Sequence, residues 1–390
     1  MNRVYLDHNA TSSLRPAARE AMLGVLAETG NASSVHREGQ AARAHVERAR
    51  AQVAGLIGAD PQAVIFTSGA TEAIATALSP DLELSSRAIR CDVLLVSGVE
   101  HPAVRAGGRF REDRIETVPV DRNGVVDLGA LDLMLGRHKG AGRRPFVSVM
   151  AANNETGAIQ PVAEIGRRTH EIGGVFHVDA VQIAGRYPFD LETSGADLIS
   201  ISSHKLGGPQ GAGALIARNE ATRVPPLLRG GGQERGGRAG TENVAAIAGF
   251  GAAAEDAVLN VSEEAGRLAG LREKLEQGIR AILAHIVIFS DTALRVPNTT
   301  CFAVPGMTAE TALIAFDLEG VAVSSGSACS SGKVGASPAL AAMKVELELA
   351  KCAIRASTGW NTTDADIVRF LEVFARVYAP MIKTSRTKAA

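Results

Sequence analysis

The sequence predicts an α/β protein in which helices sandwich a mainly parallel sheet, followed by a smaller α+β domain. Between Val64 and Arg218, short apolar runs alternate with polar or glycine-rich turns and then with helical patterns. From Thr241 the pattern changes to a long alanine-rich helical stretch and then to shorter strands and helices. A length of 390 residues is typical of about two domains.

The apolar runs of the first part are short and rich in β-branched residues. Such runs are typical of strands that are buried on both faces of a parallel sheet. The piece between two of them, 163–172, has helical spacing. The strands predicted in this way lie at 64–66, 93–96, 146–150, 175–178, 198–201 and 214–217.

The second part contains three further apolar runs, at 286–289, 300–304 and 352–355, separated by helical segments. We therefore expect a large domain over 14–258. A small domain would be formed by 1–13 together with 259–390.

Composition excludes several classes of protein. Hydrophobic residues make up 46% of the chain and the formal net charge is -1, which is unlike disordered, collagen-like or coiled-coil proteins. A near-zero charge gives no long-range attraction to nucleic acid or to anionic membranes. Without an uninterrupted apolar stretch of about 18 residues, and with Asp7 too early for a signal peptide, we expect a soluble cytoplasmic protein.

The cysteines Cys91, Cys301, Cys329 and Cys352 are far apart in the sequence, and no pair has Cys-x-x-Cys spacing. This spacing favours reduced thiols over a disulfide framework or a zinc site. We expect no metal. Cys91, Cys301 and Cys352 adjoin or lie within apolar runs and are typical of small core residues.

Polar residues follow several predicted strands at the point where each strand ends. Asp179 follows the run 175–178, Lys205 follows 198–201, and His101 comes just after 93–97. The segment 64–72 indicates a strand, a small-residue turn and a helix start, which is a natural seat for phosphate. Because the ends of parallel strands share one edge of the sheet, these groups should lie together. Taken singly, a salt bridge, an ordinary helix cap and a structural histidine remain alternatives.

Together these groups describe a site for pyridoxal 5'-phosphate. The lysine would form a Schiff base with the aldehyde, and the carboxylate would keep the ring nitrogen protonated, which makes the ring an electron sink. The helix start would hold the phosphate. The imidazole would stack on the ring and move protons.

The chain resembles the cysteine desulfurases of the NifS/IscS type, in the class V aminotransferase family with the type I pyridoxal-phosphate fold. The resemblance runs from Tyr5 to about Ser357. Its most specific segments are 100–104, 152–157, 177–182, 202–205, 230–243 and 324–329. The last of these, which ends at Cys329, distinguishes the chain from a plain aminotransferase.

The resemblance implies a role for each site residue. Lys205 would bond to the cofactor and remove the substrate proton, and His101 would stack on the ring and act as acid and base. Arg355, assisted by Asn31 and Asn154, would bind the substrate carboxylate. The cofactor would be held by Asp179, Gln182, Asn154, Ala70, Thr71, Ser202 and His204, and by Thr241 from the other subunit of a homodimer.

Cys329 lies in a segment, 324–335, composed almost entirely of Ser, Gly, Ala and Val. Such a segment buries little apolar surface, so we expect a mobile loop. In the resembling family its thiolate attacks the substrate sulfur and keeps it as a persulfide. Because a free thiol is mostly protonated at neutral pH, His101 would take or share its proton.

The implied activity is conversion of L-cysteine to L-alanine, with the sulfur supplied to an acceptor such as an iron–sulfur scaffold protein. A selenocysteine lyase or another class V aminotransferase-like enzyme would share Lys205 and Asp179. A cofactor-free binding module on the same fold is the alternative from another class. Whether the role is specific to nitrogen fixation or general stays open. Ser203, in place of the family's usual glycine, and Ala356, in place of phenylalanine, depart from the pattern.

Overall fold

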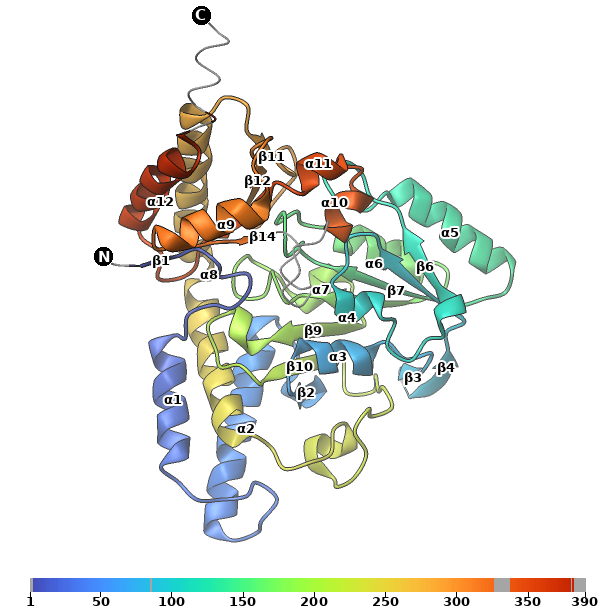
Figure 1. Ribbon diagram of the computed structural model, residues 1–390. Helices are drawn as coiled ribbons and strands as arrows, with labels where there is room; N and C mark the ends of the chain where they lie inside the picture. The colour runs from blue at the N-terminus through green and yellow to red at the C-terminus, as the bar shows by residue number, and fades with distance from the viewer. Residues whose placement is uncertain (1–2, 85, 326–336, 380, 382–390) are drawn as a thin grey trace, which may run out of the picture.

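A computed structural model describes residues 3–84, 86–325, 337–379 and 381. Its centre is a seven-stranded sheet with the order β2-β10-β9-β8-β7-β5-β6, visible at the middle of Figure 1. Only β10 runs antiparallel to its neighbours β2 and β9, and the strands from β9 to β6 are parallel. The strands are β2 (Val64–Thr67), β5 (Val93–Ser97), β6 (Ile115–Val118), β7 (Pro145–Met150), β8 (Val175–Asp179), β9 (Leu198–Ser202) and β10 (Gly213–Ala217).

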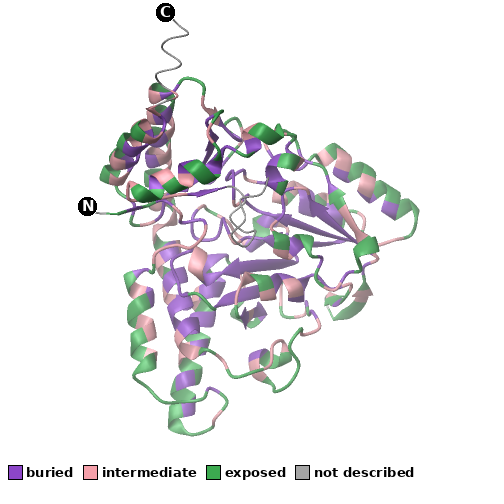
Figure 2. Ribbon diagram, viewed as in Figure 1, coloured by how far each residue is buried: buried purple, intermediate pink, exposed green. Residues whose placement is uncertain are grey.

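Helices cover both faces of this sheet because successive strand residues point to opposite sides. Val93 and Leu95 of β5 join the core beneath α2, α5, α6 and α8, whereas Leu94 and Val96 join the core beneath α3. The buried strands stand out in Figure 2. The predicted α/β class with the type I arrangement is confirmed. The helices of this part are α1 (Pro16–Leu26), α2 (Arg37–Leu56), α3 (Ala70–Ala77), α4 (Pro102–Arg105), α5 (Leu128–Gly140), α6 (Val162–His170) and α7 (Leu191–Ser194).

The remaining chain forms a four-stranded antiparallel sheet with the order β11-β12-β15-β14 and the helices around it. The N-terminal strand β1 pairs in parallel with β13 of this part. The strands are β1 (Val4–Tyr5), β11 (Val287–Ile288), β12 (Thr299–Ala303), β13 (Val321–Ala322), β14 (Ser324–Ser325) and β15 (Ala353–Ser357), and the helices are α9 (Ala309–Leu318), α10 (Pro338–Ala342), α11 (Leu347–Ala350) and α12 (Asp364–Val377).

The long helix α8 (Val244–Ile282) joins the two parts and runs along one side of the molecule in Figure 1. Ala246 and Phe250 in its first half pack with α1 and α2 against the large sheet's core. Leu271 and Ile279 in its second half belong to the core beside α12. The predicted boundary at 258/259 falls inside this helix, and the division into domains stays a prediction. One stretch of α8 is long and apolar enough to cross a membrane, but half of that stretch is buried inside the protein.

Several strands were not predicted from the sequence: the two-residue strands β1, β13 and β14, strand β6, and the hairpin of β3 (Asp81–Leu84) and β4 (Arg87–Arg90). Strand β6 (Ile115–Val118) has the sequence Ile-Glu-Thr-Val, which is not a continuous apolar run. The hairpin of β3 and β4 is mostly charged and exposed. Neither carries a residue of the predicted site.

Candidate active site

A cavity of about 620 Å³ opens at the edge of the sheet where the parallel strands end. The ends of β7, β8 and β9 and His101 after β5 contribute to its lining, together with the start of α3 and the N-terminal segment 9–11. The structure therefore brings together most of the residues predicted for the site. Those that line the cavity are Ala70, Thr71, His101, Asn154, Asp179, Gln182, Ser202, His204, Lys205 and Arg355.

Lys205 lies on the short helix η3 (Ser203–Lys205), which directly follows β9. Its Nζ donates hydrogen bonds to two backbone carbonyls, those of Asn9 at 2.6 Å and Ala10 at 2.8 Å. Both acceptors come from the N-terminal segment, about 195 residues away in the sequence. The amine is thereby held at the wall of the cavity, beside the other predicted groups.

Asp179 is the last residue of β8 and is almost completely buried. Its Oδ1 accepts a hydrogen bond from the amide of Val181 at 3.0 Å. Burial raises the pKa of this carboxyl to about 6, and the amide bond and the charge of Lys205 only partly oppose that rise. A cationic partner such as a protonated ring nitrogen would remove this penalty, because an opposite charge favours the ionised form.

Two histidines of the cavity are neutral at pH 7. His101 caps α4, and its Nδ1 accepts a hydrogen bond from the amide of Ala103 at 3.1 Å, which places the proton of the neutral ring on Nε2. Burial and the charge of Lys205 lower the pKa of His101. Burial, with the charges of Lys205 and Arg186, lowers the pKa of His204 to about 4. His101 is therefore neutral at pH 7, and it can accept a proton only at Nδ1, in place of the hydrogen bond from Ala103.

The first turn of α3 faces the cavity with Ala70 and Thr71. Its free amides and the positive end of the helix suit a phosphate group. Gly213 at the start of β10 allows this placement, because a Cβ there would lie 2.6 Å from the carbonyl carbon of Gly69. Ser202 and His204 lie on the same cavity.

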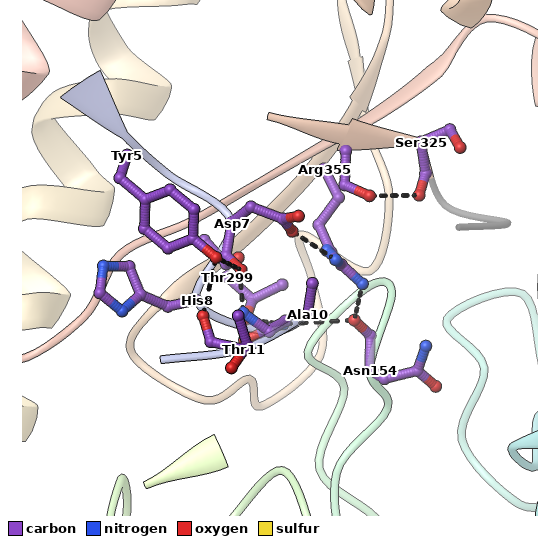
Figure 3. Close-up of polar contacts among 12 residues, drawn as sticks. Tyr5, Asp7, His8, Ala10, Thr11, Asn154, Thr299, Ser325 and Arg355 are labelled. Atoms are coloured by element: carbon purple, nitrogen blue, oxygen red, sulfur yellow. Dashed lines mark hydrogen bonds and ion pairs between the residues drawn. The ribbon is translucent and has the colours of Figure 1, made fainter. Parts of the chain in front are cut away.

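Arg355 on β15 reaches the cavity from the small sheet. Its side chain lies between Asp7, 2.7 Å from Nη2, and the carbonyl of Asn154, 2.9 Å from Nη1 (Figure 3). Its Nε is buried and has no hydrogen-bond partner among the described residues. A guanidinium that still has N–H groups to donate is suited to a carboxylate ligand.

Two predicted site residues of the described chain, Asn31 and Thr241, do not line the cavity. Asn31 is exposed, and its Oδ1 accepts a hydrogen bond from the amide of Ser33 at 2.9 Å. Thr241 is exposed in the segment before α8. Cys329 lies outside the described residues. The roles of all three stay predictions.

The other cysteines, Cys91, Cys301 and Cys352, are buried. Burial raises the pKa of Cys91 to about 12 and also raises the pKa of Cys301. The Sγ of Cys352 donates a hydrogen bond to the carbonyl of Glu348. Because only the thiolate is a good nucleophile, neither Cys91 nor Cys301 is suited to sulfur chemistry.

Sequence reasoning missed Asn9, which uses all its hydrogen-bonding groups at the site. Its backbone carbonyl accepts from Lys205 and Gln182. Its side chain bonds to four partners, and its amide donates to the Oγ of Ser357. The side-chain partners are Asn154, Arg186, Asn298 and Thr299. Its position in the segment 5–11, where the family resemblance begins, was the available signal.

Glu100 was also missed, although it precedes His101. It is buried, and one oxygen accepts hydrogen bonds from the hydroxyl of Ser97 on β5 and the amide of Met150 on β7. Its other oxygen, Oε2, has no partner among the described residues. Burial raises the pKa of this carboxyl to about 8, so Glu100 is largely neutral at pH 7 and links the ends of β5 and β7.

This pKa predicts how the stability of the protein depends on pH. An unfolded glutamate ionises near pH 4.5 and the buried one near pH 8, so the folded state binds more protons between those values and stability falls as pH rises. At about 1.4 kcal/mol per pH unit, Glu100→Gln should recover up to about 5 kcal/mol at pH 8 and almost nothing at pH 4.

Denaturant unfolding of both proteins at pH 4.5, 6 and 8 measures this difference. The control Glu171→Gln makes the same change at an exposed position, where no buried carboxyl is replaced, so no comparable gain is expected at pH 8. An equal gain for Glu100→Gln at all three pH values would show that Glu100 is ionised in the folded protein.

The donor set of the cavity fits pyridoxal phosphate. Amides and hydroxyls at the start of α3 suit the phosphate, a buried carboxylate with a raised pKa suits a cationic ring nitrogen, and a lysine amine lies beside both. A lysine and a carboxylate at the strand ends of such a sheet are typical of pyridoxal-phosphate enzymes of the type I fold. The chain belongs to the class V aminotransferase family, whose model, "Aminotransferase class-V", matches residues 4–370.

Within that family, its relatives point to one group. The chain is 42% identical over 391 residues, covering 99% of this chain and 96% of the relative, to a cysteine desulfurase of Gluconacetobacter diazotrophicus. It is 40% identical to the cysteine desulfurase IscS of Dictyoglomus turgidum, over 96% of this chain and 94% of that one. A solved NifS-like protein of Rickettsia africae superposes with a TM-score of 0.87 and 34% identity, over 97% of this chain and 100% of that chain. The family predicted from the motifs is confirmed.

Proposed function

We propose that the chain is a pyridoxal-phosphate-dependent cysteine desulfurase. It converts L-cysteine to L-alanine and transfers the sulfur to Cys329 as a persulfide. The observation that carries this proposal is the meeting of Lys205, Asp179, His101 and Arg355 in one cavity, in a chain 42% identical to a cysteine desulfurase over nearly its whole length. The relatives are named as cysteine desulfurases, which does not favour the alternative of a selenocysteine lyase.

Each residue has a physical task in this reaction. Arg355 binds and orients the substrate carboxylate, and its contact with Asp7 fixes the guanidinium. When bound, pyridoxal phosphate supplies an electron sink for the charge that develops at the substrate Cα. Lys205 takes the proton from that carbon, and the amides at the start of α3 with Ser202 and His204 hold the phosphate. His101, neutral at pH 7, accepts the proton of the attacking thiol at Nδ1, and its hydrogen bond from the amide of Ala103 is then broken.

The exposed position of Thr241 supports a homodimer in which this residue completes the partner's phosphate site. The sulfur is passed to an acceptor protein such as an iron–sulfur scaffold, and the location is the cytoplasm. The naming of one relative as IscS supports the iron–sulfur role. Sedimentation of the purified protein tests the dimer, and recovery of ³⁵S-labelled acceptor from cell extract tests the transfer.

The activity itself is tested with purified protein, L-cysteine and a thiol reductant. Equal amounts of L-alanine and sulfide should form, and the protein should be yellow. A colourless protein that binds no pyridoxal phosphate would instead support the cofactor-free binding module. Formation of alanine from L-selenocysteine but not from L-cysteine would support the lyase.

Replacing Cys329 by serine separates cofactor chemistry from sulfur transfer. Sulfide release should fall roughly 10²–10⁴-fold, which is the usual effect of removing one positioned catalytic group, while the visible band of the cofactor remains. The persulfide is measured by alkylation and mass spectrometry. Cys91→Ala, which removes a buried thiol of the core, is the matched control and should keep both the persulfide and the activity. Undiminished sulfide release by Cys329→Ser would refute the nucleophilic role.

A further inference from the structure

Arg186 differs from the other buried arginines of the described chain, because no carboxylate lies within ion-pair distance of it. Each of the others has one at 2.7 Å: Asp256 for Arg15, Glu234 for Arg50, Glu276 for Arg295 and Asp7 for Arg355. A buried charge without a counter-charge is costly to the folded protein. The position of Arg186 next to Lys205 gives a functional reason for keeping this unfavourable buried charge.

The guanidinium of Arg186 donates hydrogen bonds to four neutral oxygens around Lys205. Nη2 donates to the backbone carbonyl of Lys205 itself at 2.6 Å and to that of His8 at 2.8 Å. Nη1 donates to the side-chain oxygens of Asn9, at 2.8 Å, and Gln182. Asn9 in turn presents the carbonyl that accepts from the Nζ of Lys205. Arg186 therefore fixes both the backbone of the lysine and one acceptor of its amine.

Arg186 does not line the active-site cavity but a small void behind it, which Lys205 also borders. The charge of Arg186 therefore acts on the active site from the far side of Lys205, without contact with the cavity. No substrate or cofactor contact is required of Arg186, which acts through Lys205.

Most ionisable groups around Lys205 are paired or neutral. On the cavity side, Arg355 is paired with Asp7, Glu72 is paired with Arg238, and the buried Asp179 feels the charge of Lys205. Burial lowers the pKa of His101, and it lowers the pKa of His204 to about 4, so both rings are neutral.

Behind the cavity wall, Arg15 is paired with Asp256 and Glu264. Burial and the charge of Arg186 lower the pKa of His8 to about 3. Arg186 thus stays the one buried cation without a counter-charge near Lys205 in the described chain.

We propose that Arg186 is a positioning residue for Lys205, and that its unneutralised charge keeps the lysine side chain in the neutral form that can accept a proton. The physical reason is that a fixed cation in a low-dielectric region disfavours a second positive charge nearby. Asp179, which would have the opposite effect, is occupied by the ring nitrogen when the cofactor is bound. The inference rests on the proposed function of Lys205.

Spectrophotometric pH titration of the yellow band that the lysine-bound cofactor gives tests this proposal on the holoenzyme. Arg186→Gln keeps an amide donor and removes the charge. The pH at the midpoint of the titration of this band should therefore rise by about 1 unit. Arg186→Lys keeps the charge and loses the forked geometry, so its midpoint should stay near that of the unmodified protein. Arg186→Met is a second neutral variant for use if the glutamine variant does not fold.

Asn298→Ala is the matched control. It removes a buried side chain that bonds to Asn9 but leaves the charge of Arg186, so the midpoint should not move. An unchanged midpoint in the neutral variants, or an equal rise in Asn298→Ala, would overturn the proposal. A colourless unmodified protein would instead overturn the proposed function, which keeps the two failures distinct.

Discussion

Replacing Lys205 by alanine should give a colourless protein whose desulfurase activity is reduced by at least roughly 10²–10⁴-fold, since the variant loses both the covalent attachment of the cofactor and the positioned base. The amine of Lys205 is held by the carbonyls of Asn9 and Ala10 beside Asp179 in the cavity. No other lysine lines that cavity among the described residues. Absorbance of the purified protein and single-turnover formation of alanine measure the two losses.

The control for this variant is Lys351→Ala. Lys351 pairs with Glu348 at the surface and lies away from the cavity lining, so the variant should be yellow and active. Addition of a small primary amine to Lys205→Ala should restore part of the proton transfer. A yellow, fully active Lys205→Ala protein would contradict the assignment of Lys205.

Replacing Arg355 by alanine should impair binding of L-cysteine more than any other change in the cavity that leaves the cofactor attached. Hydrogen bonds to charged groups contribute about 1.5–3 kcal/mol each, so loss of two such bonds to a carboxylate predicts a fall in kcat/KM of at least roughly 100-fold. The loss should appear mainly as a higher KM, because Arg355 contacts the substrate before and during the reaction. Steady-state kinetics with L-cysteine measure it.

Arg355→Lys and Asp7→Asn refine this test. The lysine variant keeps the charge but not the fork, so it should recover part of the affinity. Asp7→Asn leaves the guanidinium in place and weakens only the contact at Nη2, so its effect should be smaller than that of Arg355→Ala. An unchanged KM in Arg355→Ala, with the visible band of the cofactor retained, would show that the substrate carboxylate binds elsewhere.

The central sheet and much of the site were predictable because each signal is local in sequence. Buried parallel strands are continuous apolar runs, and the residues that follow them must meet at one edge. Lys205, Asp179 and His101 each lie within a few residues of a strand end, and the structure brings all three to one cavity. Strand β6 was not predicted because it lies at the edge of the sheet and contains two polar residues, so it is not a continuous apolar run.

Other features of the site depend on contacts that no local pattern carries. Arg186 and Asn9 meet across 177 residues, and a sequence without structure does not show which buried arginine lacks an acid. The local sequence around Glu100 does not show that this glutamate is buried between β5 and β7. Thr241 and Asn31 were predicted by resemblance alone, and within one chain they do not line the cavity.

The N-terminal segment that forms part of the cavity wall has a consequence for biosynthesis. Asn9 bonds to Ser357 across 348 residues, and β1 pairs with β13 near the other end of the chain. Asn9 is therefore synthesised long before Ser357, and this part of the wall can form only after both residues have been made. We expect chain fragments that end before β15 to lack a complete cavity.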